Sequence, residues 1–189
     1  MPDSSPRHSL LATLVATLVA ASSLGQLFAQ DTPAPPPEQI TFVGYNLKNW
    51  LPMDRRIDGD LVEDATKPED EKAALIALLS TTKPDIVGIC EIGSRSDVED
   101  FQARLKAAGH DLPHLEWLQA SDPYRHVAAI SKFPVVATDH QGDLSYNIDD
   151  KTLPFSRGIL DATIQVTADY QLRILGLHLK SKRDVPEAD

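Results

Sequence analysis

The chain has 189 residues, of which 42% are hydrophobic and 24% charged, a composition typical of a globular domain and not of a disordered or fibrous chain. The 28 acidic residues outnumber the 18 Lys and Arg residues, so a net charge of −10 repels polyanions at long range. Capture of a polyanion would need a bound cation or a local basic patch. The single cysteine, Cys90, excludes an internal disulfide, and its place in an apolar run favours packing over a role as nucleophile.

Residues 1–29 are predicted to be a signal peptide. A short positive region precedes the apolar run LLATLVATLVAA, and cleavage is expected after Ala29 or Gln30. The alternative is an uncleaved anchor, because residues 9–30 carry no charge. We favour removal, which predicts a secreted or periplasmic protein without a stable membrane span. The proline-rich residues 30–39 are typical of a stiff linker.

Strand and helix patterns alternate along residues 40–189, the predicted folded domain. Runs rich in β-branched residues predict strands, and apolar residues three and four positions apart predict helices. Strands are expected over 40–46 and 85–91, helices over 66–82 and 96–109, two strands or one bent strand over 125–138, and a β-hairpin over 158–166 and 172–179. The alternation predicts an α/β fold with a mixed sheet covered by helices.

Both helices carry start signals. Thr66 with Glu69, and Ser96 with Glu99, have the spacing of capping boxes, in which a hydroxyl and a carboxylate satisfy the first free N–H groups. Gly109 follows the second helix and is expected to end it, because glycine readily adopts the left-handed conformation found at helix ends.

Polar residues occur at the ends of several apolar strands. Asn46 ends the first strand and Glu91 the second, and a β-α-β connection would bring both to the carboxyl edge of one sheet, where open α/β sheets bind ligands. The hairpin would place Arg157, at the start of its first strand, beside His178 and Lys180 at the end of its second. The alternative for each is an ordinary surface residue. Burying Glu91 unpaired would cost several kcal/mol, so it needs a partner.

Five segments carry a family resemblance: YNLKNW, KPDIVGICEIG, AAISKFPVV, SRGILDATI and LRILGLHLKSK. In order and spacing they resemble the endonuclease/exonuclease/phosphatase family, which includes deoxyribonuclease I-like enzymes. The resemblance covers residues 40–183. It implies a two-sheet α-β-β-α sandwich and a metal-dependent attack of water on a phosphate ester.

The resemblance also implies roles for the strand-end residues. Glu91 would ligate Mg²⁺ or Mn²⁺ and Asn46 would complete the metal surroundings, as suits hard oxygen ligands. Arg157 would contact the phosphate through planar paired donors, and His178 would stabilise charge developing on the phosphate oxygens. Lys180 would help to hold a polyanionic substrate, although a solvated surface lysine is the alternative.

The family pattern continues with an Asp-x-Asn pair and a terminal Asp-His pair, and the sequence reaches Asp189 without them. We therefore expect the chain to be the N-terminal portion of such a domain and, alone, nearly inactive. The predicted function is that of an exported metal-dependent phosphodiester hydrolase, with a nuclease favoured. The alternatives are a phosphatase or sphingomyelinase-like activity of the same fold, and a non-catalytic exported binding module.

Overall fold

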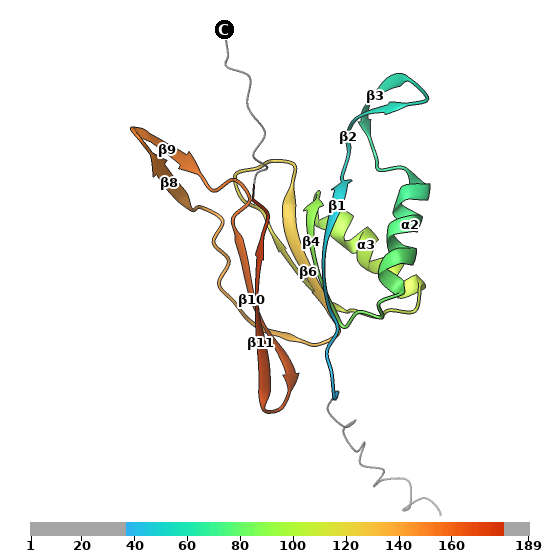
Figure 1. The fold of residues 1–189 in the computed structure, drawn as a ribbon, viewed down its shortest axis with the longest axis vertical. Coiled ribbons are helices and arrows are strands. Elements are labelled where there is room, and N and C mark those ends of the chain that lie inside the picture. The colour runs from blue at the N-terminus through green and yellow to red at the C-terminus, as the bar shows by residue number, and fades with distance from the viewer. Residues whose placement is uncertain (1–36, 180–189) are drawn as a thin grey trace, which may run out of the picture. The chain divides into compact units, whose positions relative to one another are not determined.

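The computed structural model describes residues 37–179 (Figure 1). The predicted signal peptide, most of the linker and Lys180 lie outside these residues. The elements in chain order are β1 (Phe42–Trp50), β2 (Met53–Ile57), β3 (Asp60–Ala65), α2 (Glu69–Ser80), β4 (Ile86–Ile92), α3 (Arg95–Ala107), β5 (His114–Leu118), β6 (His126–Ser131), β7 (Val135–Thr138), β8 (Ser145–Ile148), β9 (Lys151–Pro154), β10 (Ile159–Thr167) and β11 (Tyr170–Leu177).

The strands form two larger sheets and two separate hairpins. One sheet has the order β1-β4-β6-β5 and the other β11-β10-β7, while β2–β3 and β8–β9 pair by themselves. Strands β1 and β4 are parallel, as predicted, and the hairpin β10–β11 is confirmed. Residues 125–138 form two strands that belong to different sheets, because the chain turns away at Pro134. The fold is therefore mixed α/β with several sheets.

Strand β4 is buried on both faces, which explains its continuous apolar run. Val87 and Ile89 pack into the cluster formed with α2 and α3, whereas Ile86 packs against the β11-β10-β7 sheet. Both helices thus cover one face of the four-stranded sheet, and the second sheet covers the other (Figure 1). Phe101 of α3 meets Trp50 edge-to-face at 5.2 Å between ring centroids.

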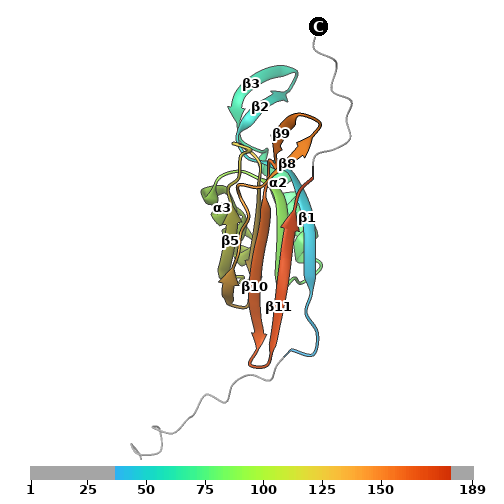
Figure 2. The same cartoon turned by 90° about the vertical axis from the view of Figure 1, so that its left-hand side faces the viewer.

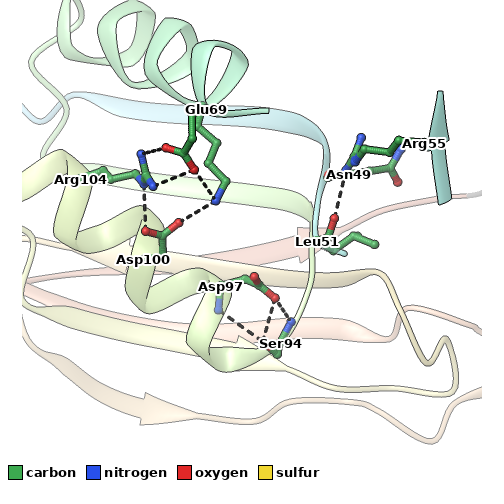
Figure 3. Close-up of polar contacts among 9 residues, drawn as sticks. Asn49, Leu51, Arg55, Glu69, Ser94, Asp97, Asp100 and Arg104 are labelled. Carbon is green, nitrogen blue, oxygen red and sulfur yellow. Dashed lines mark hydrogen bonds and ion pairs between the residues drawn. The ribbon is translucent and has the colours of Figure 1, made fainter. Parts of the chain in front are cut away.

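Helix α2 begins differently from the prediction. The residue before its first turn is Pro68, which offers no side-chain acceptor, so the predicted box of Thr66 with Glu69 is wrong. Glu69 instead pairs across to α3, with its Oε2 2.9 Å from Nη1 of Arg104. Arg104 also donates from Nε to Asp100 Oδ1 at 2.9 Å (Figure 3). The charge at the start of α2 therefore ties the two helices together.

Helix α3 has a capping box, but it lies two residues earlier than predicted. Ser94 Oγ accepts the N–H of Asp97 at 3.3 Å, and Asp97 Oδ2 accepts the N–H of Ser94 at 2.7 Å (Figure 3). The predicted box of Ser96 with Glu99 is therefore wrong. Gly109 follows the helix with φ +95°, as the prediction required.

The hairpins β2–β3 and β8–β9 project from the same end of the two sheets (Figures 1 and 2). This is also the end at which β1 and β4, which run parallel, finish. Across residues 37–179, no helix combines the length and the apolar character needed to cross a bilayer.

Candidate active site

The parallel pair β1–β4 carries Asn46 and Glu91 to one edge. Asn46 lies opposite Cys90 in the ladder, and the register shifts immediately beyond this pair. Glu91 has φ +58°, a left-handed conformation that is uncommon for residues other than glycine and that gathers at functional sites. Glu91 thus lies in an irregularity of the ladder near the carboxyl end of β4.

Glu91 and His178 meet at this edge. Glu91 Oε1 lies 3.5 Å from His178 Nε2, and the two side chains are 20% and 15% exposed. His178 follows β11, so the contact joins the end of a parallel strand to the end of the β10–β11 hairpin. The partly buried carboxylate thus has a partner, as its position at the end of an apolar strand required.

The environment of His178 favours its neutral form. Burial lowers the pKa of the imidazole, and the positive charge of Arg157 lowers it further, while Glu91 acts in the opposite direction. The Nδ1 atom is buried and makes no hydrogen bond within residues 37–179. A neutral imidazole with one unpaired ring nitrogen can still donate or accept one hydrogen bond.

Arg157 is held by Asp122. Its Nε donates to Asp122 Oδ2 at 3.2 Å, and both side chains are 13% exposed. Asp122 Oδ1 accepts the main-chain N–H groups of Tyr124 and Arg125, each at 3.0 Å. Burial acts to raise the pKa of Asp122, but these N–H groups and the Arg157 guanidinium outweigh it, so the pKa is lowered. Asp122 therefore stays ionised and fixes the direction of Arg157.

A second arginine, Arg125, links the segment between β5 and β6 to Glu91. Arg125 Nε donates to Asn49 Oδ1 at 2.8 Å, and the main-chain N–H of Asn49 donates to Glu91 Oε2 at 3.2 Å. Arg55 Nη2 holds the same turn by donating to the carbonyls of Asn49 and Leu51 at 2.7 and 3.0 Å (Figure 3). Asn49 lies within β1 and has φ +62°.

The sequence did not identify Asp122, Arg125 or Asn49 as site residues. Asp122 is followed by Pro123 and accepts the N–H two residues on, the pattern of an Asx-turn, and this signal could have marked the turn but not its partners. Arg125 and Asn49, which contact each other, are 76 positions apart in the sequence, so no local sequence pattern indicates their contact.

Arg157 and His178 also share a cavity of about 430 Å³, as the predicted hairpin geometry required. Asn46 is placed differently. Its Oδ1 accepts the N–H of Lys48 at 2.8 Å, and it lines a second cavity, of about 350 Å³, between the two sheets. In the part of the chain that the structure describes, no hydrogen bond joins Asn46 to Glu91, Arg157 or His178.

The donors at this edge suit a hard divalent cation. Glu91 supplies one carboxylate, and the Asn46 amide oxygen, which accepts the N–H of Lys48, keeps one lone pair for a cation. Mg²⁺ commonly takes one or two protein carboxylates together with water and substrate phosphate. No three His, Cys, Asp or Glu side chains among residues 37–179 cluster closely enough to bind a metal by themselves.

Cys90 shows the features of a packing residue. It contacts the cluster formed by Val127 and Leu160 between the sheets. Burial, assisted by the neighbouring Glu91 carboxylate, raises the pKa of its thiol to about 11, so it stays protonated at neutral pH. A protonated thiol is a poor nucleophile.

The chain matches no protein-family model, no curated protein and no solved structure.

Proposed function

We propose that the protein is an exported, metal-dependent phosphodiester hydrolase that acts on nucleic acid, with the α-β-β-α sandwich of the endonuclease/exonuclease/phosphatase family. The observation that supports this most directly is the contact between Glu91 and His178, together with the cavity that His178 shares with Arg157. A carboxylate, a guanidinium and an imidazole from three separate strand ends are the groups that a phosphate ester and its metal ion require.

The proposal gives each group a role. Glu91 and Asn46 hold Mg²⁺ or Mn²⁺, which supplies Lewis-acid polarisation of a phosphate oxygen when bound. Arg157, aimed through its Nε–Asp122 contact, directs its terminal nitrogens to the phosphate oxygens. His178 donates a hydrogen bond to the oxygen on which charge develops. Arg125 acts through Asn49 by holding the turn whose N–H fixes Glu91, and is therefore a positioning residue.

Hydrolysis by the full chain tests this directly. Single-stranded and duplex DNA, RNA, sphingomyelin vesicles and a phosphomonoester are incubated with the chain and with Mg²⁺ or Mn²⁺. Because the chain alone is expected to be nearly inactive, we expect only slow cleavage of nucleic acid, which Glu91→Gln lowers by at least about tenfold. The matched control is Glu116→Gln, because Glu116 Oε2 also lies 3.3 Å from a histidine, Nε2 of His140, and its side chain is 27% exposed.

Equal cleavage by Glu91→Gln and Glu116→Gln would contradict the proposed role of Glu91. Preferential cleavage of sphingomyelin or of the phosphomonoester would keep the reaction class and replace the substrate. Failure of the chain to act on any of the substrates, together with failure to bind Mn²⁺, would favour the non-catalytic binding module.

A further inference from the structure

The cavity that holds Arg157 and His178 has an apolar wall on its other side. This wall is formed by Tyr146 of β8, Pro154 of β9 and Phe155, which line the cavity together with Arg157 and His178. Its volume, about 430 Å³, lies in the range of sites that bind small organic ligands. The combination of aromatic and apolar walls with a guanidinium indicates a ligand that has a planar or apolar part attached to an anion.

The β8–β9 hairpin is held firmly enough to form such a wall. Tyr146 lies opposite Leu153 in the ladder, and the N–H of Phe155 donates to the carbonyl of Leu144 at 2.7 Å, which closes the base of the hairpin. The Thr152 hydroxyl donates to Asn147 Oδ1 at 2.8 Å across the two strands. These contacts hold the backbone of Tyr146 and Phe155, both of which line the cavity.

Tyr146 presents an accessible aromatic ring at the wall of the cavity. Its side chain is 45% exposed, on a hairpin strand whose four residues are all exposed. An aromatic ring that is half accessible beside a phosphate-binding arginine can stack on a nucleobase, since every base has a π-face. The turn of the hairpin carries Asp149 and Asp150, which repel a long polyanion beyond the cavity.

We propose that this cavity is the subsite for one base of a single-stranded nucleic acid, with Tyr146 stacking on the base whose phosphate lies at Arg157 and His178. The inference rests on the proposed function and adds the substrate class. The acidic turn and the net charge of −10 favour a single nucleotide held locally over a duplex bound along a surface. A base in the cavity would contact the aromatic and apolar side chains, while its phosphate would contact Arg157.

The test compares adenosine monophosphate with ribose 5-phosphate, which has the same phosphate and sugar but no base. Affinities of the full chain for both are measured by calorimetry in the presence of Mg²⁺. We expect adenosine monophosphate to bind about tenfold more tightly, as base stacking on an aromatic side chain provides. Tyr146→Leu should remove this preference and leave the affinity for ribose 5-phosphate unchanged, while Tyr146→Phe should keep it.

Tyr170→Ala is the matched control, because Tyr170 is 49% exposed on the other hairpin, at the start of β11. It should leave both affinities unchanged. Equal affinities for the two probes in the wild type would overturn the base subsite and leave the phosphate site standing. Binding of neither probe would count against the proposed function itself. Tighter, Tyr146-dependent binding of phosphocholine than of adenosine monophosphate would overturn the inference in favour of a lipid headgroup.

Discussion

Replacement of Asp122 tests how firmly Arg157 is positioned. Asp122 accepts the N–H groups of Tyr124 and Arg125 at 3.0 Å and Arg157 Nε at 3.2 Å. With both side chains of the pair 13% exposed, Asp122→Ala leaves a largely buried guanidinium without its partner. Breaking a buried pair costs about 3–5 kcal/mol, and the remaining exposure reduces this to an expected loss of about 2–4 kcal/mol in the free energy of unfolding.

Asp122→Asn removes the negative charge of the side chain but keeps its shape. The amide oxygen can still accept the two main-chain N–H groups, so we expect a loss of only about 1–2 kcal/mol. Urea denaturation followed by circular dichroism measures both values. The control is Asp169→Ala, in the exposed turn between β10 and β11, which should change stability by less than about 0.5 kcal/mol. A loss below about 1 kcal/mol for Asp122→Ala would refute the reasoning that Asp122 anchors Arg157.

Three further predictions concern stability. Burial lowers the pKa of His126 in the folded chain, whereas histidine in the unfolded chain titrates at about 6.5. The unfolded chain therefore takes up a proton first, and the free energy of unfolding falls as the pH drops below about 6.5. An NMR titration midpoint of His126 at or above about 6.5 would contradict this. Ser94→Ala removes the cap of α3 and should cost about 0.5–2 kcal/mol in urea denaturation, while Ser96→Ala should cost much less. Gly158 has φ +62°, and a Cβ added there would lie 2.6 Å from a main-chain oxygen, so Gly158→Ala should lower the free energy of unfolding by about 1–3 kcal/mol. Gly59→Ala, whose added Cβ meets no atom within 4 Å, should lower it less. Equal losses for the two variants would show that the close approach at Gly158 is unimportant.

The sequence predicted the elements whose apolar pattern is long and buried. Strand β4 and the β10–β11 hairpin follow from such patterns, and so does the presence of α2 and α3. The hairpins β2–β3 and β8–β9 were missed because they bury little, so that few of their positions carry a hydrophobic signal. The starts of the helices were misplaced because several Ser, Thr and acidic residues precede each one, and only the packed structure selects among them.

The candidate site was predictable only in part. Arg157 and His178 come together because the two ends of a hairpin have fixed places, which the order of elements determines. The contact of His178 with Glu91 joins two different sheets, and neither the βαβ unit nor the hairpin specifies it. Asp122, Arg125 and Asn49 lie in a turn and a left-handed bulge, whose positions depend on contacts between distant segments. No periodicity or spacing reports such contacts.

The most direct test of the account is the position of bound Mn²⁺. Paramagnetic Mn²⁺ broadens nearby NMR signals, so the imidazole signals of the full chain are followed as Mn²⁺ is added. We expect the His178 signals to broaden first, because His178 lies 3.5 Å from Glu91, while the signals of His140, which is paired with Glu116, stay sharp. Glu91→Gln should remove the effect on His178. Equal broadening of the two histidines, or broadening of His178 that persists in Glu91→Gln, would contradict a metal site at Glu91.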